Sequence, residues 1–158
     1  VHYPYPVIRM AEMYLNLAEI LIELDALENT TGRLEEAKGS IDKIRVRAGI
    51  PTIDEAWKKA NHPEKANTAE GLREIVRRER QIEFYLENQR FWDLRRWKDA
   101  GILGEKVWGM NIEGDTDETF FVPTELQNIR TFKQAQYLMP IPMTETNKVP
   151  HIVQNPGY

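Results

Sequence analysis

Apolar residues recur at helical spacing in the first part of the chain, on two sides of the same segment. At about 100° per residue, one broad apolar face runs from Ile8 to Ile22, and a second apolar set lies on the other side. Pro6 suits a first helical turn, and the cluster 29–32 breaks the pattern, so we predict a helix from after Pro6 to about Glu28. The narrow polar stripe that remains consists of Arg9, Glu12, Asn16, Glu19 and Glu23. A helix that is apolar almost all round packs on several sides.

The same periodicity predicts a second helix from Leu34 to about Ala48. Gly49 and Pro51 end this pattern. Two helices joined by a short turn form an antiparallel αα-hairpin, and this pair has about the length of a tetratricopeptide repeat. The pattern indicates a tetratricopeptide-like helix pair. It is only weak support for a repeat, because this segment lacks the Trp and Gly of the usual repeat signature.

Further helices are expected in the middle of the chain. Residues 54–60 suit a short helix, and Thr68 suits the N-cap of a long one. That long helix is expected to include Leu72, Ile75, Val76, Ile82 and Leu86. After a break near Asn88, another helix should run from residue 91 to Gly101.

The pattern changes after Gly104. Residues 105–112 and 119–122 are expected to form short strands around a turn at 114–117, and residues 136–142 are expected to be extended because prolines forbid a helix there. We therefore predict a mainly α fold, with tetratricopeptide-like antiparallel helix pairs and a loop-rich C-terminal tail that contains short strands. We expect residues 1–158 to form one domain, helical over 6–101 and irregular over 102–158.

Two carboxylates fall on the apolar face of the third long helix. Glu79 and Glu83 lie between Val76 and Leu86, and Arg90 would join them if the helix continued. A buried unpaired charge costs several kcal/mol. The pair therefore indicates either a glycoside-hydrolase site or a structural ion network. We favour the network because arginine can bind two carboxylates at once. The expected partners are Arg90, Arg95, Arg9 and Arg45, and the polar stripe with Glu12 is expected to face the same network.

Composition excludes several other classes of function. The net charge is −4, and acidic residues are interleaved in the basic, aromatic segment 90–98, so no nucleic-acid partner is expected. The sequence has no cysteine, and its three histidines lack ligand spacing, so we expect neither a metal site nor a cofactor. The acidic turn 115–118 lacks the spacing of a calcium loop and is expected to be solvated. No apolar run approaches the ~20 residues of a membrane span.

Trp57 and Trp108 are the candidates for contact with a ligand. Both fall in less regular segments, and an exposed aromatic ring can stack on the apolar face of a sugar. Simple packing is the competing interpretation for each, because tryptophan is a mostly buried residue type.

Five segments together resemble one family. They are PVIRMAEMYLNLAE at 6–19, IRVRAGIP at 44–51, ERQIE with Glu87 and RFWDLRRWK within 79–98, LMPIP at 138–142, and QNPGY at 154–158. In this order and over nearly the whole chain, they resemble the C-terminal region of SusD/RagB proteins.

This resemblance implies a fold and a function. Such proteins are non-catalytic surface lipoproteins of the outer membrane of Bacteroidetes, used in polysaccharide utilisation. Each partners a TonB-dependent SusC-like transporter and passes it oligosaccharides or, in some members, peptides. The resemblance also implies that a longer N-terminal part, with the lipidated cysteine and most ligand contacts, lies outside this chain. The alternative function is a helical-repeat scaffold that binds protein partners.

Overall fold

The computed structural model describes residues 8–126 and 130–158 of the chain. The chain forms two compact units, Val1–Arg90 and Phe91–Tyr158. The boundary between them falls before the expected change from helix to tail at 101/102. The expectation that residues 1–158 form a single domain stays a prediction.

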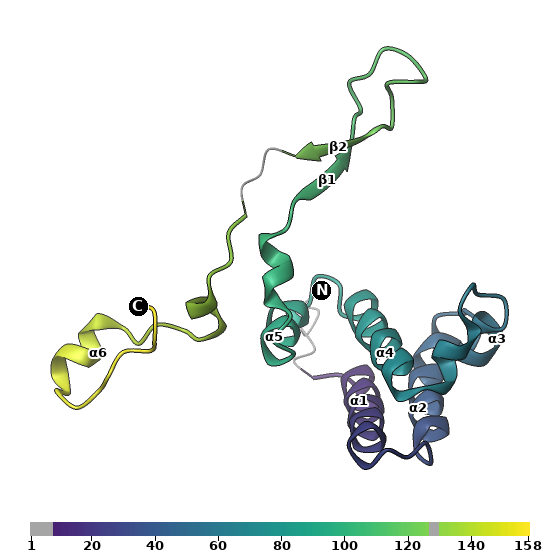
Figure 1. Ribbon diagram of the computed structural model, residues 1–158, viewed down its shortest axis with the longest axis horizontal. Helices are drawn as coiled ribbons and strands as arrows, with labels where there is room; N and C mark the ends of the chain where they lie inside the picture. Colours follow the sequence, from purple (N-terminus) through teal and green to yellow (C-terminus); the bar gives the residue numbers. More distant parts are fainter. Residues whose placement is uncertain (1–7, 127–129) are drawn as a thin grey trace, which may run out of the picture. The chain divides into compact units, whose positions relative to one another are not determined.

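The first unit is a helical layer built on one helix pair. Helices α1 and α2 run antiparallel and pack on each other, and α4 packs on both (Figure 1). The elements of this unit are α1 (Met10–Glu28), α2 (Leu34–Arg47), α3 (Ile53–Trp57), the 3₁₀ helix η1 (Pro63–Asn67) and α4 (Ala69–Glu83). The expected start of the first helix, just after Pro6, lies outside the described residues.

The core of this unit comes from the helix faces that the periodicity indicated. Leu15 and Ile22 of α1, Ile41 of α2, and Leu72 and Val76 of α4 are fully buried. Ala18 and Ala37 are also fully buried, at the packed faces of α1 and α2. Small side chains at buried helix positions allow neighbouring helix backbones to come close together.

Helix α4 begins as predicted but ends earlier than expected. The Thr68 side chain caps it by accepting a hydrogen bond from the Gly71 N–H at 3.1 Å. The helix ends at Glu83, and Leu86 takes a left-handed backbone conformation with φ of 67°. The helix includes Ile82, as predicted, but the expectation that it includes Leu86 is wrong, and Leu86 is exposed. Phe84 turns into the core instead.

The second unit is irregular and has short elements. Helix α5 (Gln89–Arg96) crosses the boundary between the units, and the others are η2 (Ala100–Gly104), β1 (Val107–Met110), β2 (Pro123–Leu126), η3 (Gln134–Tyr137) and α6 (Met143–Lys148). The two strands form an antiparallel hairpin in which Val107 pairs with Leu126. A mainly α fold with a loop-rich tail that contains short strands is thus confirmed.

Two expectations for this unit were wrong in detail. The second strand lies at 123–126 and not at 119–122, because a turn closed by the Phe120 N–H on the Thr116 carbonyl at 2.8 Å extends further than expected. Residues 134–137 form a 3₁₀ helix where the start of an extended segment was expected. Helix α6 was not predicted. Pro142 does not prevent this helix, because it stands just before the first turn, where proline is tolerated.

Candidate functional site

Glu83 is the centre of an ion network that joins three helices of the first unit. The Arg9 guanidinium, just before α1, donates to the Glu83 carboxylate and, at 2.7 Å, to the Glu83 carbonyl. It also donates to both carboxylate oxygens of Glu87, at 2.9 and 2.7 Å. From α2, Arg47 donates to both carboxylate oxygens of Glu83 at 2.6 and 2.7 Å. One carboxylate on α4 therefore fixes the start of α1 and the end of α2.

One helical turn earlier, Glu79 makes a second link between α4 and α2. Its carboxylate accepts a hydrogen bond from Arg45, and both side chains are nearly buried, with 12% and 11% of their surfaces exposed. The same arginine donates to the Pro51 carbonyl at 2.7 Å. Arg45 therefore holds both α4 and the chain that leaves α2.

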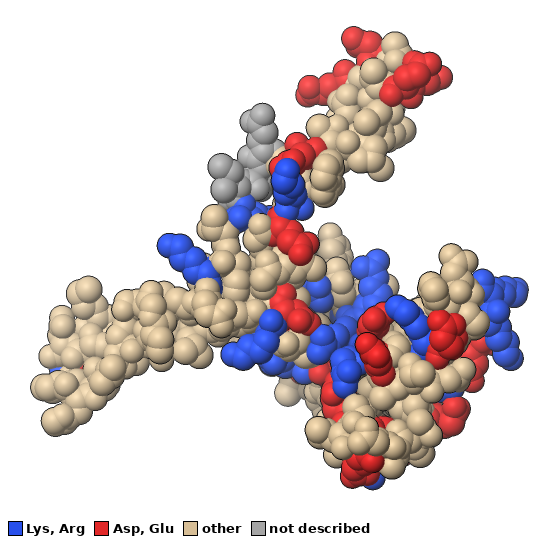
Figure 2. All heavy atoms as spheres, viewed as in Figure 1, with Lys and Arg blue, Asp and Glu red and all other residues tan. Residues whose placement is uncertain are grey.

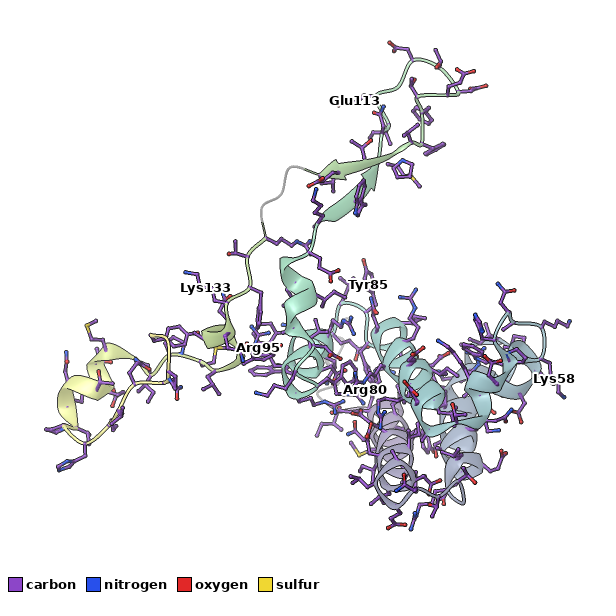
Figure 3. The ribbon with its side chains drawn as sticks, viewed as in Figure 1. Lys58, Arg80, Tyr85, Arg95, Glu113 and Lys133 are labelled. Carbon is purple, nitrogen blue, oxygen red and sulfur yellow. The ribbon has the colours of Figure 1, made fainter. Side chains whose placement is uncertain are left out.

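Side chains of the polar stripe of α1 bind arginines of α4, among them Arg80, which is labelled in Figure 3. The buried Arg80 guanidinium donates to Asn16 at 2.7 Å and lies 3.8 Å from the Glu19 carboxylate. Glu23 lies two turns after Asn16 on α1. Its two carboxylate oxygens accept hydrogen bonds from Arg73 of α4 at 2.5 and 2.7 Å. The contact between α1 and α4 therefore includes a row of charged and polar pairs beside the apolar core.

The network determines the charge states of its members. Burial would raise the pKa of Glu83, but hydrogen bonds from Arg9 and Arg47 lower it below the ordinary value. The hydrogen bond to Glu87 raises the pKa of Arg9, with Glu83 adding to the same effect. Glu83 is therefore an ionised carboxylate at neutral pH, held between two permanent cations.

This geometry does not suit a pair of catalytic carboxylates. A glycosidase needs one carboxylic acid whose pKa is raised, so that it can protonate the leaving group. The pKa of Glu83 is lowered instead, and the carboxylates of Glu79 and Glu83 both form ion pairs with arginines. The arrangement can hold helices together, and it offers no free acid in the described residues of this cluster.

For Glu12 and Arg90, membership of the network stays a prediction. Glu12 is half-buried on α1, and Arg90 is half-buried on α5. Arg95 was an expected partner of the glutamates, but it donates to the Phe91 and Gln136 carbonyls at 3.0 and 3.1 Å. Its guanidinium also lies 3.5 Å from the centre of the Phe91 ring. Arg47 was not anticipated, although its place in the matched segment 44–51, beside Arg45, was a usable signal.

Trp57 lies at a hollow in the first unit. It is half-buried, packs against the core, and borders a hollow of about 310 Å³ near the end of α3, close to Lys58 (Figure 3). The lining residues are Glu35, Lys38, Asp54, Trp57, Lys58, Pro63, Ala66 and Asn67. An aromatic wall with polar groups around it is a common arrangement for a small polar ligand.

The polar groups of this hollow are arranged around one ammonium. Lys38 donates to Asp54 at 3.1 Å and to Asn67 at 3.4 Å, and it lies 2.6 Å from Glu35. Burial would lower the pKa of Lys38, but the bonds to Glu35 and Asp54 raise it above its ordinary value. The hollow thus contains a fixed positive charge beside an aromatic ring.

Trp108 has a different environment, on strand β1 of the hairpin. Its side chain is 62% exposed and lies opposite Glu125 in the strand register. The far end of the hairpin is acidic, as Figure 2 shows, with Glu113, Asp115, Asp117 and Glu118 in that turn. Trp57 and Trp108 belong to different units, and no common site is assigned to them.

In the second unit, two of the recognisable segments bind each other. The Gln154 side chain accepts from the Ile141 N–H at 2.9 Å and donates to the Ile141 carbonyl at 2.8 Å. Asn155 donates to the Met139 carbonyl at 2.6 Å. The amide side chains of the segment QNPGY therefore bind backbone groups of the segment LMPIP, as a neighbouring strand would.

Metal and membrane features were searched over residues 8–126 and 130–158. Within these ranges no group of three or more His, Asp or Glu side chains is arranged to hold a metal ion. In the same part of the chain, no helix has both the length and the apolar character to cross a membrane.

Comparison with known proteins gives consistent matches to one family. The model of the SusD family matches residues 1–158. A crystal structure of a SusD-like protein (BF3747) from Bacteroides fragilis is 35% identical, with a TM-score of 0.71. The structure of BT4246 is 31% identical with a TM-score of 0.74, and its selenomethionine form is 30% identical with a TM-score of 0.76. No curated protein matches the chain.

Each match covers the whole of this chain but only part of the related protein. All three structures align with 100% of this sequence, which covers 28% of BF3747, and 25% and 24% of the two BT4246 chains. The sequence therefore spans about a quarter of the length of these solved relatives. Because the family model matches the sequence from its first residue to its last, the chain belongs to the SusD family.

Proposed function

We propose that this chain is the helical C-terminal part of a non-catalytic protein that binds nutrients at the cell surface. The observation that carries this proposal is the match of the SusD family model to all of residues 1–158. The ligand is an oligosaccharide or a peptide, and the partner is a TonB-dependent SusC-like transporter. The protein faces outward on the outer membrane and is anchored by lipid through a segment outside this chain.

Within that protein, the first unit serves as scaffold. Its charged residues Glu79 and Glu83 are paired with arginines from two other helices, which fits a structural role and not a catalytic one. Buried ion pairs of this kind contribute to specific packing, and loss of one partner is costly. The structural network of this proposal comprises Arg9, Glu12, Glu79, Glu83 and Arg90, with Arg45 and Arg47 added.

Calorimetry on the full-length protein tests the proposal. The protein is titrated with a panel of oligosaccharides and peptides and incubated with each one to detect turnover. The proposal predicts binding of at least one ligand without any change in its covalent structure. Hydrolysis of a bound glycan that is lost in the Glu79→Gln variant would contradict it.

Trp57 is the residue of this chain best placed to contact a ligand. Its ring borders the hollow that also holds the charged Lys38, whereas Trp108 is exposed on a hairpin. If the hollow contributes to binding, Trp57→Ala weakens binding by roughly fivefold or more, since one aromatic contact contributes about 1 kcal/mol or more. Tyr85→Ala, at an exposed aromatic residue of the first unit that does not line this hollow, is the matched control. Equal affinities of the wild type and Trp57→Ala would remove the hollow from the binding surface.

A further inference from the structure

The hollow beside Trp57 is small and is built from three elements of the first unit. Its lining comes from α2, α3 and η1, together with Lys58, which directly follows α3. It measures about 310 Å³, at the small end of the range for ligand sites in proteins. A hollow of this size suits a single ring better than an extended chain.

An aromatic ring forms one wall of the hollow. Trp57 packs against the apolar core of the first unit and also borders the hollow. Contact with the core fixes the ring before a ligand arrives, so little conformational freedom is lost on binding. A flat indole surface suits a ligand with an apolar face and polar groups around its edge.

A buried ammonium arranges the polar groups around that wall. Lys38 is only 4% exposed. Its Nζ donates to Asp54 at 3.1 Å and to Asn67 at 3.4 Å, and it lies 2.6 Å from the Glu35 carboxylate. An ammonium has three N–H donors, so these three partners use all of them. Lys38 therefore holds the surrounding acceptors in place and keeps no donor for a ligand.

The charges that line the hollow cancel. Two carboxylates, those of Glu35 and Asp54, stand against two ammonium groups, those of Lys38 and Lys58. A charged ligand would lose its hydration here without meeting a net charge of opposite sign, which is unfavourable. An uncharged ligand has no such penalty, so the lining favours a neutral molecule.

The positions of the two carboxylates favour neighbouring hydroxyl groups as the donors. Both bind the same nitrogen of Lys38, so they lie close together. The Glu35 and Asp54 side chains are 78% and 52% exposed, and a carboxylate can accept about four hydrogen bonds, so both have acceptor capacity left. Hydroxyls on adjacent carbons of a sugar ring match this arrangement. A peptide backbone has one N–H per residue, with an acceptor oxygen beside it, and matches it less well.

We propose that this hollow binds one uncharged sugar ring, whose apolar face lies on Trp57 and whose neighbouring hydroxyls donate to Glu35 and Asp54. The Asn67 amide, whose carbonyl oxygen is held by Lys38, donates from its nitrogen to a further hydroxyl. Lys38 is a positioning residue and does not touch the sugar. The inference rests on the proposed function in taking the protein as nutrient-binding, and it assigns a saccharide, not a peptide, to this site.

Hydrogen exchange of the full-length protein, followed peptide by peptide by mass spectrometry, tests this inference. The probes are the methyl glycosides of glucose, galactose, mannose and xylose at millimolar concentration, the uronic acid and amino sugar of matching ring, and a short uncharged peptide. Exchange is read in residues 53–67, so binding elsewhere in the protein does not count. Ligand-observed NMR gives the Kd of each probe.

The inference predicts that at least one neutral glycoside slows exchange in residues 53–67, because a bound ligand suppresses local opening. The charged sugars of the same ring should bind roughly fivefold or more weakly. Trp57→Ala should abolish the protection, and Tyr85→Ala, at an exposed aromatic residue outside the hollow, should retain it.

A charge variant separates a ligand-binding role of Glu35 from a structural one. Glu35 is exposed in the first turn of α2, and Glu35→Gln keeps the side-chain size but leaves the lining with a net positive charge. The neutral glycoside should then bind more weakly, and the uronic acid should gain on it by roughly fivefold. A purely structural glutamate would leave this ratio unchanged.

Three results would overturn the inference: no neutral glycoside protects residues 53–67, a charged sugar or the peptide protects them better, or Glu35→Gln leaves the ratio unchanged. An oligosaccharide that binds the full-length protein without protecting these residues would remove the hollow and leave the proposed function intact. A full-length protein that binds no oligosaccharide or peptide at all would contradict the proposed function itself.

Discussion

The two units of the chain are stabilised in different ways. The first, up to Arg90, has a continuous apolar core and charged pairs between helices. In the second, only Leu94 and Ala100 are buried hydrophobic residues among those described, and side-chain bonds to backbone groups hold its terminal segments. Segments that are equally easy to recognise in the sequence therefore have different physical roles: in the first unit they join helices, and in the second they bind backbone groups of the tail. Substitutions should therefore act very differently in the two units.

The largest effect is expected at Glu83. Glu83→Ala removes a nearly buried carboxylate that binds both Arg9 and Arg47. The loss of this link between three helices should destabilise the first unit by about 3 kcal/mol. The control is Glu74→Ala on the same helix, whose carboxylate pairs with Lys65 at the surface and should contribute less than about 1 kcal/mol. Urea denaturation measures both. Equal losses would remove the distinction between the two pairs.

A smaller effect is expected where helix α4 begins. A Cβ at Gly71 would collide with the backbone of Lys65, so Gly71→Ala should cost about 2 kcal/mol through overpacking. Gly39 in α2 has open space around its Cα, and Gly39→Ala should stabilise the helix by about 1 kcal/mol. Thermal unfolding of the two variants should thus shift in opposite directions. A shift of the same sign in both would show that the α4 start is not as tightly packed as described.

The sequence predicted the first unit better than the second for a physical reason. Helical periodicity reports burial on one face, and it correctly indicated Leu15, Ile41 and Leu72 as core residues. It also placed Glu79 and Glu83 among apolar neighbours, which pointed to an arginine network. It could not identify Arg47 as a partner, because the register between α2 and α4 depends on how the two helices pack.

In the second unit, local patterns contained less information. Helix α6 and strand β2 are short, and β2 depends on a turn whose length is set by hydrogen bonds at Thr116. The sequence showed apolar residues on a second side of the first helix, but that Met10, Ile20 and Leu27 are exposed could be seen only in the structure. Contact of Gln154 with Ile141 joins segments that no periodicity relates.

Acidification should affect the first unit through the carboxylate of Glu83. Its pKa is lowered in the folded protein from the ordinary 4.5, so its stabilising effect is complete above about pH 4.5 and is lost as the pH falls through the folded value. Stability measured between neutral pH and pH 3 should fall, and Glu83→Gln should flatten this dependence. The same slope in both proteins would mean that other carboxylates carry it.

The smallest effect is expected on the hairpin. Trp108 is largely exposed and contributes little to a core, so Trp108→Ala should change the free energy of unfolding by no more than about 0.5 kcal/mol. Chemical denaturation followed by circular dichroism measures it. A loss of 2 kcal/mol or more would show that the hairpin is packed as firmly as the helices, and the contrast between the units would then fail.

The most direct test of the central claim combines stability and binding in one variant. Glu83→Gln in the full-length protein keeps the size of the side chain but removes the charge that Arg9 and Arg47 bind. If the network is scaffold, the free energy of unfolding falls while the Kd for the nutrient ligand stays unchanged. Unchanged stability with a lost or strongly weakened ligand would contradict the account and make Glu83 part of the binding site.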